Sequence, residues 1–459
     1  MARGWMSGTL LLILDREGEA QEEVEVVDYD GLVAEAKRVW RAVYGKTISF
    51  RMMLADGSKM GRARYGELAS GDVVTLVVKG AEKEKEKGKG KEKGKEKAKD
   101  KGKRKGKDKE RRKVKGKEEA ESPEERIRRA FPEDMKLSSF EIVRTVGTGT
   151  FGRVLLARYA EKNGQVYAIK CLRKADILRQ KQVRHVLSET RVMAEISHPF
   201  IVNMRWCFQD MRNIYMVLDY VVGGELFTYL GNLEKLSMEM TVFFAAEIIL
   251  VLEYLHKNGI VYRDLKPENV LIAMDGHIRL ADYGFAKKME PRDSTFTVCG
   301  TVDYLAPEII KKQGHGFGVD LWAIGVLIFE MLAGYPPFED DSQIAICTRI
   351  LDVDLDFPDE FDDVTIDVIE ALIVEEEEDR LGVGEGGFDQ LKRHPFFRSV
   401  DWEEAAAGRM QPLFVPAVSS VDDTSCFPIY DEVDITAMDD EDLAVDQSIF
   451  AEFCKPFDL

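Results

Sequence analysis

The sequence lacks any long apolar run. None of its 459 residues lie in a stretch that reaches the roughly 18–20 apolar residues of a membrane-spanning helix. The apolar run at residues 10–14 is too short for the core of a secretory signal, and Ala2 stands where an N-myristoylation signal requires glycine. We therefore expect no membrane span and no lipid anchor here, and we expect the protein to be cytoplasmic.

Cysteine is also scarce. The six cysteines are scattered, and no two are spaced Cys-x-x-Cys. This pattern favours a reducing compartment and argues against a zinc site. The composition, 45% hydrophobic and 32% charged, fits a globular protein, and the length suits two or three domains.

The charge is unevenly distributed. Residues 82–119 carry 20 Lys and Arg against 10 Asp and Glu, within a chain whose net charge is −18. This Lys/Glu/Gly segment has too few apolar residues to bury a core, and its repeated glycines disfavour a long helix, so we expect disorder. It could act as a basic tether for nucleic acid, acidic lipid or a nuclear import receptor, or equally as a solvated spacer. Nucleic acid is not expected as a partner elsewhere in the chain, and a nuclear location stays open.

Residues 1–80 read as a small α/β domain. Strand-like runs at 9–14, 24–27, 48–54 and 73–78 surround a segment at 32–43 with apolar residues at helical spacing. This ββαββ order resembles the ubiquitin-like β-grasp domain, although Lys79-Gly80 lacks a free double-glycine tail. A docking or oligomerising module with an unknown partner is our preferred interpretation; a generic α/β cap is the alternative.

One octet, residues 262–269, concentrates reactive side chains. Asp264 can accept a proton from an attacking hydroxyl, Lys266 can neutralise a transferring phosphoryl group, and Asn269 can give an oxygen to a metal ion. Phosphoryl transfer needs these three parts, because its catalysis is mostly positioning and charge stabilisation. Alone, the octet could be a polar turn before the apolar run at 270–272.

A glycine loop lies upstream. Residues 147–152 read Gly-Thr-Gly-Thr-Phe-Gly, between strand-like runs at 140–146 and 154–159. In a dinucleotide-binding fold a helix would follow the glycines, whereas here strands follow, the second ending at Lys170. The pattern predicts a flap over nucleotide phosphates with a lysine on the third strand. Glu189 interrupts the apolar stripe of a helix predicted over 182–196, in a position to reach Lys170.

Other segments of the sequence also carry clear helix or strand signals. Ser122-Pro123 with two following acids predicts a helix start, and the helix runs to about residue 130. A buried strand is expected at 213–220, a long apolar helix at 241–255, and a helix buried on nearly every face at 319–332.

Together these motifs resemble the AGC group of eukaryotic protein kinases, and within it the catalytic subunits of cAMP-dependent protein kinase. The resemblance covers about residues 140–453 and rests on the glycine loop, Val166-Tyr167-Ala168-Ile169-Lys170, Glu189, Tyr262-Arg263-Asp264, Asp282-Tyr283-Gly284 and Ala306-Pro307-Glu308. It implies an α+β, bilobal protein-kinase fold, with a small β-rich lobe and a large helical lobe, after the β-grasp domain. The expected organisation is a ubiquitin-like domain at 1–80, a linker at 81–121, a short helix and lead-in at 122–139, a kinase domain at 140–397 and an AGC-type tail at 398–459.

The resemblance implies a Ser/Thr kinase that uses ATP and Mg²⁺. Lys170 would bind the α- and β-phosphates and pair with Glu189, while Lys266 would contact the γ-phosphate. Asp264 would orient the substrate hydroxyl and accept its proton. Asn269 and Asp282 would hold the Mg²⁺ ions. The ATP-binding positions carried over are Gly147, Thr148, Gly149, Thr150, Phe151, Gly152, Val154, Ala168, Lys170, Leu218, Asp219, Val221, Leu271 and Phe427.

Substrate choice follows from charge in the resembling positions. Four acids match sites that pair with arginines preceding the acceptor Ser or Thr, and guanidinium fits carboxylate in geometry as well as charge. They are Glu225, Glu268, Glu330 and Asp303. The implied substrates are proteins with Arg upstream of Ser or Thr; a cyclic-nucleotide-binding regulatory subunit is left open as a partner.

Regulation is implied at the activation loop and the tail. Thr297 stands at the family's phosphorylation site, with His185, Arg263 and Lys287 at the positions that would bind the phosphate. Arg380 is expected to pair with Glu308 in the large lobe. In the tail, residues 427–430 would fold over the nucleotide pocket and residues 450–453 would dock on the small lobe; an apolar patch in a disordered tail is the alternative.

Four departures from the family pattern affect these expectations. Tyr283 replaces the usual Phe, so its hydroxyl needs a partner, and Val302 replaces a Pro in the loop that receives the residue after the acceptor. The activation loop is about two residues longer, and Cys454 stands where many relatives carry a phosphorylatable residue. A non-catalytic scaffold would show degraded catalytic positions, and we find none, so partner binding through residues 1–80 is an added role at most.

Overall fold

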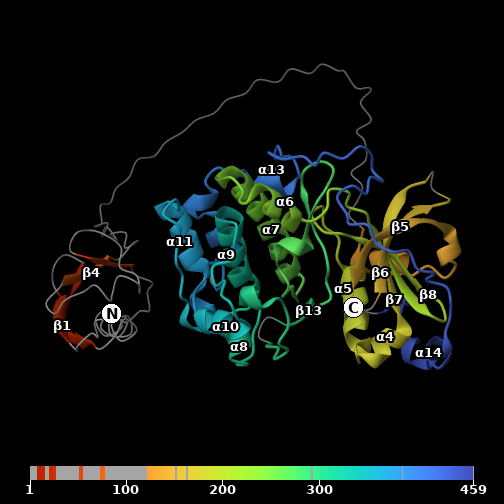
Figure 1. Ribbon diagram of the computed structural model, residues 1–459, viewed down its shortest axis with the longest axis horizontal. Helices are drawn as coiled ribbons and strands as arrows, with labels where there is room; N and C mark the ends of the chain where they lie inside the picture. The colour runs from red at the N-terminus through yellow and green to blue at the C-terminus, as the bar shows by residue number, and fades with distance from the viewer. Residues whose placement is uncertain are drawn as a thin grey trace, which may run out of the picture. The chain divides into compact units, whose positions relative to one another are not determined.

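The computed structural model describes residues 8–15, 20–26, 51–54, 73–77, 121–149, 152–161, 164–290, 293–384 and 386–457. The chain divides into two compact units, Met1–Glu119 and Ala120–Leu459 (Figure 1). The second unit carries all of the residues expected to take part in catalysis.

Four strands are described in the first unit: β1 (Gly8–Asp15), β2 (Ala20–Val26), β3 (Arg51–Leu54) and β4 (Val73–Val77). They form one sheet in the order β2-β1-β4-β3, in which β1 and β4 are parallel and the other neighbours are antiparallel. The helix expected at 32–43 and the basic segment 82–119 lie outside the described residues. The ubiquitin-like assignment of residues 1–80 therefore stays a prediction.

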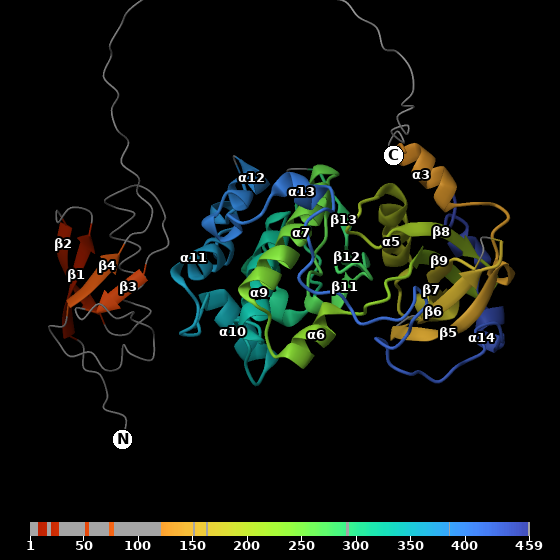
Figure 2. The same ribbon diagram turned by 90° about the horizontal axis from the view of Figure 1, so that it is seen from above.

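The small lobe of the second unit is built on a five-stranded antiparallel sheet in the order β5-β6-β7-β9-β8. One face carries aromatic rings, including Phe140 and Phe208, which stack at 6.2 Å. Helices pack on the other side, as Figure 2 shows for α5. The elements are β5 (Phe140–Gly149), β6 (Gly152–Tyr159), β7 (Val166–Arg173), α4 (Lys174–Arg179), α5 (Val183–Glu195), β8 (Met204–Gln209) and β9 (Asn213–Asp219). Each expected strand and the Glu189 helix are confirmed, while β8 was not predicted.

Helix α3 (Pro123–Ala130) begins where the sequence predicts. The side chains and backbones of Ser122 and Glu125 form a reciprocal capping box. Arg126 donates from Nε and Nη2 to the carbonyl oxygen of Glu195, at 3.0 and 2.7 Å. The helix is thus fastened to the end of α5 and belongs to the small lobe.

The large lobe is helical, and its centre is α9. Trp322 and Phe329 of α9 are completely buried, which confirms the prediction of a helix enclosed on nearly every face. Short strands carry the catalytic segments between the helices. The elements are α6 (Leu226–Leu233), α7 (Met238–Lys257), β10 (Ile260–Val261), β11 (Val270–Ile272), β12 (Ile278–Leu280), β13 (Lys287–Lys288), α8 (Pro307–Ile310), α9 (Gly318–Ala333), α10 (Gln343–Asp352), α11 (Asp363–Leu372), α12 (Gly387–Lys392) and α13 (Trp402–Ala406).

The tail after α13 runs from the large lobe to the small lobe and includes the single turn α14 (Asp440–Leu443). Phe450 and Phe453 are 0% and 1% exposed, and their carbonyl oxygens each accept a 3.0 Å hydrogen bond from Nε2 of Gln209 on β8. Docking of the 450–453 segment is therefore confirmed, and the alternative of an unattached apolar patch is wrong.

Within the described residues, no helix combines the length and the apolar character that a membrane crossing requires.

Candidate active site

The octet forms a compact polar loop between β10 and β11. The side-chain amide of Asn269 donates two 2.7 Å hydrogen bonds to Asp264, one to its carbonyl oxygen and one to its Oδ2. The ammonium of Lys266 lies 3.3 Å from the same Oδ2 and donates a 3.0 Å hydrogen bond to Thr301 Oγ1. The structure thus brings together the three side chains that the sequence singled out.

The carboxylate of Asp264 has one oxygen left to act. The residue is 6% exposed, and among the residues that the structure describes its Oδ1 has no hydrogen-bond partner. Burial raises the pKa of this carboxyl, and the charge of Lys266 opposes the shift. A buried acceptor without a hydrogen-bond partner costs free energy. A substrate hydroxyl that donates to Asp264 Oδ1 would remove that cost, as expected for the atom that accepts its proton.

The loop is suspended from α9 by Asp320, which the sequence analysis missed. Its completely buried carboxylate accepts hydrogen bonds from the backbone N–H of Tyr262 at 2.9 Å and of Arg263 at 2.8 Å. It also lies 2.7 Å from His256 Nε2. The available signal was an acid in a helix whose charged residues are limited to Asp320 and Glu330, because a carboxylate among apolar residues is buried only when it has partners.

Lys170 and Glu189 form the predicted ion pair. Lys170 Nζ on β7 lies 2.6 Å from Glu189 Oε1 on α5 and 3.4 Å from Asp282 Oδ1. Burial alone would lower the pKa of Lys170, but the carboxylates of Glu189 and Asp282 outweigh it and raise that pKa. The lysine is therefore a permanent cation facing the segment that carries Asp282.

Asp282 follows β12 in a left-handed conformation, with φ of +49°. The charge of Lys170 lowers the pKa of its carboxyl, so it is ionised at neutral pH. The neighbouring Tyr283 is completely buried, and its hydroxyl donates to the carbonyl oxygen of Leu280 at 3.3 Å. The hydroxyl that replaces the usual Phe therefore has its partner, and the Asp is undisturbed.

The two expected metal ligands fit a hard cation. The amide hydrogens of Asn269 point to Asp264, which leaves the amide oxygen for a metal, and Asp282 adds an ionised carboxylate. In the described part of the chain no three His, Cys, Asp or Glu side chains cluster as a self-contained metal site. Mg²⁺ is bound through one or two protein ligands together with water and phosphate oxygens, so Asn269 and Asp282 would suffice on the protein side.

The glycine loop is the hairpin between β5 and β6. Thr148 pairs with Arg153, and Gly149 pairs with Gly152 across the two strands. A Cβ on Gly152 would lie 1.8 Å from the carbonyl oxygen of Cys171 on β7, whereas one on Gly149 would meet nothing within 4 Å. Close strand packing therefore explains Gly152. Thr150 and Phe151 lie outside the described residues.

Apart from Asp219, the side chains at the adenine positions are apolar, and they flank residues 220–224 after β9, which we call the hinge. Ala168 pairs with Leu218 across β7 and β9. The carboxylate of Asp219 is bound by Arg205 at 2.6 and 2.8 Å, and its backbone N–H donates to the carbonyl oxygen of Asn203 at 3.0 Å. Ala168 and Val221 are buried, and Val154, Leu218 and Leu271 are half-buried.

The tail passes over this hinge as expected. The ring of Phe427 lies 5.6 Å from the ring of Tyr220, centroid to centroid. The Tyr220 hydroxyl donates to the carbonyl oxygen of Asp423 at 2.6 Å. On β5, the backbone N–H and the hydroxyl of Thr145 both donate to Glu432 at 2.8 Å. The segment around residue 427 is thus fixed at both of its ends.

The four acids expected to read substrate arginines influence one another. Burial, with smaller contributions from the charges of Glu268 and Asp303, raises the pKa of Glu330 to about 7, against a hydrogen bond from Tyr304. Burial and then the charge of Glu268 raise the pKa of Glu225. Carboxylates that repel one another in this way form a concentrated negative site that a cation would relieve.

The expected phosphate site at Thr297 is only partly assembled. Thr297 and His185 are exposed. Lys287 donates a 3.0 Å hydrogen bond to the hydroxyl of Thr295, a buried neighbour, and Arg263 donates from Nε to the carbonyl oxygen of Phe285. The structure therefore directs Lys287 to Thr295, a contact that sequence reasoning did not anticipate.

The brace between Arg380 and Glu308 is confirmed. The guanidinium donates two hydrogen bonds to the carboxylate, at 2.6 and 2.7 Å, and both residues are buried. The same guanidinium lies over the ring of Trp322 at 5.2 Å from its centroid. This pair fixes the segment after the activation loop to the base of the large lobe.

Comparison with known proteins gives consistent matches. A family model described as "Protein kinase domain" matches residues 140–397. The cAMP-dependent protein kinase catalytic subunit PRKX of Mus musculus is 46% identical over 311 residues, which are 67% of this chain and 86% of that protein. Its namesake in Homo sapiens is 47% identical over 317 residues, covering 69% and 86% of the two chains. The cAMP-dependent protein kinase catalytic subunit of Dictyostelium discoideum is 48% identical over 297 residues, covering 65% of this chain and 45% of that protein.

Proposed function

Because this chain belongs to the protein kinase family and is an ATP-dependent protein serine/threonine kinase resembling the catalytic subunits of cAMP-dependent protein kinase, we propose that it phosphorylates Ser or Thr residues that follow arginines. The observation that carries the proposal is a half-buried group of acids, in which burial and then the charges of Glu268 and Asp303 make ionised Glu330 costly. A substrate guanidinium would offset that cost and form charge-assisted hydrogen bonds. Asp264, Lys266 and Lys170 are the residues that we propose to carry out the phosphoryl transfer.

The proposed catalytic roles are supported by the contacts of these side chains. Asp264 accepts the proton of the substrate hydroxyl at Oδ1, because its Oδ2 is already occupied by Asn269 and Lys266. Lys266 neutralises negative charge on the transferred group, and Lys170, held by Glu189, binds the other phosphates.

Mg²⁺-bound ATP supplies the phosphoryl group, and Asn269 and Asp282 are the residues that would hold the metal. Their oxygen atoms and the protonated Lys170 give the site the alternation of negative and positive groups that a metal–triphosphate requires.

The test uses two peptides that differ only in replacing the upstream arginines with alanine. Wild type should phosphorylate the arginine peptide with a kcat/KM at least about tenfold higher, since one charge-assisted contact is worth roughly 1.5–3 kcal/mol. Glu330→Gln should lose most of that preference, whereas Asp359→Asn, at an exposed acid of the same lobe, should keep it. Equal rates on both peptides would refute the arginine preference. Loss of all transfer in Asp264→Ala separately confirms the catalytic assignment.

We further propose that phosphorylation of Thr297 activates the enzyme. The supporting observations are its exposure and the presence of basic residues at the matching phosphate-binding positions, His185 on α5 and Arg263 and Lys287 in the large lobe. Thr297→Ala should abolish activation by an upstream kinase, and mass spectrometry should find the phosphate at Thr297. Phosphate found at Thr295, with Thr297→Ala fully active, would contradict the proposal.

Two partner roles are also proposed. A cyclic-nucleotide-binding regulatory subunit is suggested by the names of the relatives, and a pull-down with such a subunit, with and without cAMP, tests it. Residues 1–80 are proposed as a ubiquitin-like docking domain. Deleting them should change the set of co-purified proteins and leave peptide phosphorylation unchanged; an identical set would argue against docking.

A further inference from the structure

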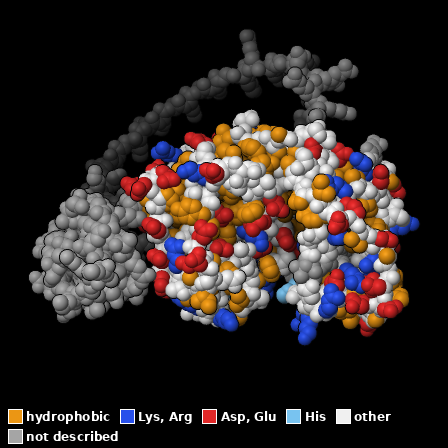
Figure 3. Space-filling model, viewed as in Figure 1, with side chains coloured by type: hydrophobic (Ala, Val, Ile, Leu, Met, Phe, Trp, Pro, Cys, Tyr) orange, Lys and Arg blue, Asp and Glu red, His pale blue; other side chains and the backbone are white. Residues whose placement is uncertain are grey.

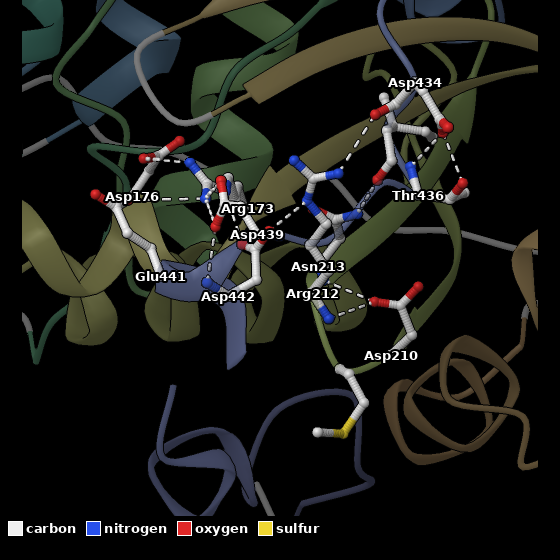
Figure 4. A network of polar contacts seen from close by, with 12 residues as sticks. Arg173, Asp176, Asp210, Arg212, Asn213, Asp434, Thr436, Asp439, Glu441 and Asp442 are labelled. Atoms are coloured by element: carbon white, nitrogen blue, oxygen red, sulfur yellow. Dashed lines mark hydrogen bonds and ion pairs between the residues drawn. The ribbon is translucent and has the colours of Figure 1, made fainter. Parts of the chain in front are cut away.

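A buried acid in the tail lies between two arginines of the small lobe. Asp442, at the third position of α14, has a completely buried side chain. Its Oδ1 accepts a 2.7 Å hydrogen bond from Arg173 Nε, and its Oδ2 lies 3.0 Å from Arg212 Nε (Figure 4). A buried carboxylate is tolerated only when it is paired in this way, so both guanidinium groups are tied to the tail.

The turn that presents Asp442 is preorganised. Asp439 and Asp442 cap each other: the backbone N–H of each donates to the other's carboxylate, at 3.2 and 3.0 Å. Asp439 also accepts from Arg173 Nη2 at 2.6 and 2.7 Å. Figure 3 shows acidic and basic side chains intermixed over this region, at the lower right of the molecule. We call Asp439, Asp442, Arg173 and Arg212 the tail clamp.

The tail clamp binds the end of β7, the strand that carries Lys170. Arg173 is the last residue of β7, three positions after Lys170, and it pairs with Asn213 on β9, the residue directly after Arg212. Helix α4 begins at the next residue, Lys174, and leads into α5, which carries Glu189. Asp442 therefore fixes the junction between the strand that carries Lys170 and the helices that lead to Glu189.

A second contact ties the same corner to the docked tail. Lys174 is 1% exposed, and its ammonium donates to Gln447 Oε1 at 2.7 Å and lies 5.2 Å from the centroid of the Phe450 ring. Because Arg173 and Lys174 are adjacent, the acidic turn and the buried aromatic segment act on one point of the backbone.

We propose that Asp442 is a positioning residue for phosphoryl transfer: by fixing Arg173 and Arg212 it holds the end of β7 so that Lys170 stays directed at the nucleotide phosphates. It touches neither substrate nor nucleotide. The inference rests on the ATP-binding role proposed for Lys170. Small displacements of a positioned group can lower rates by as much as two orders of magnitude, so the effect should be measurable.

The experiment compares Asp442→Asn with Asp440→Asn in the full chain. Asp440 lies in the same turn, is exposed and carries the same charge, so it is a matched control. Asp442→Asn should raise the dissociation constant for Mg²⁺-ATP and the KM for ATP by about tenfold, with the KM for peptide within about twofold. Asp440→Asn should leave all three within about twofold of wild type.

A purely structural anchor would behave differently. It would lower the melting temperature of Asp442→Asn and leave ATP affinity unchanged at a temperature where the variant is folded, and that result would overturn the proposal. Asp442→Glu, which keeps the charge, should recover part of the lost affinity. If Asp442→Asn does not fold, Arg173→Lys provides the test, because it keeps the cation but loses the two-sided fork.

Two further measurements separate the positioning role of Asp442 from the ATP-binding role of Lys170 on which it rests. Arg173→Ala and Asp442→Asn should together weaken ATP binding by less than the two single effects combined, since both remove the Arg173–Asp442 contact. Full additivity would contradict a shared contact. Lys170→Met should weaken ATP binding strongly; if it does not, the role of Lys170 fails, whereas a normal Asp442→Asn beside a defective Lys170→Met refutes only the positioning role.

Discussion

The backbone N–H of Arg263 donates a 2.8 Å hydrogen bond to the carboxylate of Asp320, across 57 residues of sequence. Arg263 has φ of +68°, a conformation that a non-glycine residue keeps only when its surroundings enforce it. Asp320 supplies that enforcement from the rigid, buried α9. The octet thus depends on helix α9 for the backbone at Arg263, in addition to its internal contacts between Asn269 and Asp264.

Asp320→Asn should therefore impair catalysis without removing ATP binding. An amide keeps the size but offers one acceptor oxygen where the carboxylate serves two backbone N–H groups. We expect kcat to fall by about 10²-fold, with the KM for ATP within about threefold. Steady-state kinetics measure both, and Asp352→Asn, at an exposed acid of the same lobe, is the control. A normal kcat would mean that the loop keeps its shape unaided.

Recognition of arginine should depend on pH through Glu330, whose pKa is raised to about 7. Below that pH the carboxyl is mostly protonated and neutral, and above it the carboxylate is available to a guanidinium. The KM for an arginine peptide should fall by about tenfold as pH rises from about 6 to about 8. Glu330→Gln should have a high KM that does not change over this range. The alanine peptide serves as the control, and an equal pH response with it would exclude Glu330 as the cause.

Removing Arg380 should strongly destabilise the large lobe. Arg380→Ala leaves the buried carboxylate of Glu308 without its bidentate partner, which typically costs about 3–5 kcal/mol. Urea unfolding followed by tryptophan fluorescence measures the loss. Arg393→Ala is the matched control, because that arginine is 75% exposed and lies 3.9 Å from Asp389, a pair worth at most about 1 kcal/mol. Similar losses in the two variants would show that burial does not set the strength of the Arg380 pair.

Two alanine substitutions in the glycine loop should differ sharply in stability. In Gly152→Ala the new methyl group would lie 1.8 Å from a backbone oxygen of β7, so β6 and β7 must separate, and we expect a loss of about 3 kcal/mol or more. In Gly149→Ala the methyl group meets nothing within 4 Å, and the loss should stay below about 1 kcal/mol. Thermal unfolding without nucleotide distinguishes them. Equal melting temperatures would show that the two strands can move apart easily.

The sequence predicted what local patterns encode. The strand, loop and lysine order around residues 140–170 and the stripe broken by Glu189 were enough to place Lys170 beside its carboxylate. The octet was enough to predict that Asp264 and Asn269 lie together, because the two residues are only five positions apart. The family resemblance supplied Arg380 and Glu308, which are 72 residues apart.

Partners set by topology were not predictable in this way. Asp320 and Arg263 meet only because α9 runs beneath the loop, and Arg173 meets Asp442 across 269 residues. No periodicity or motif links such residues. The contact of Lys287 with Thr295 was likewise not predicted, because position in a family pattern does not specify which hydroxyl of a loop is buried. The assignment of Lys287 to Thr297 stays a prediction.

Two segments of the chain, the hinge and the tail that crosses it, lie in contact between the two lobes. Within the hinge, a Cβ on Gly223 would lie 2.5 Å from Pro416 of the tail, and Tyr220 is bonded to Asp423. A single strand between two bodies permits both bending and twisting. Two segments in contact resist twisting, because rotating one body about the long axis would shear them past each other. The lobes should therefore open and close about one axis, so that Lys170 and Asp264 approach and separate along a repeatable path.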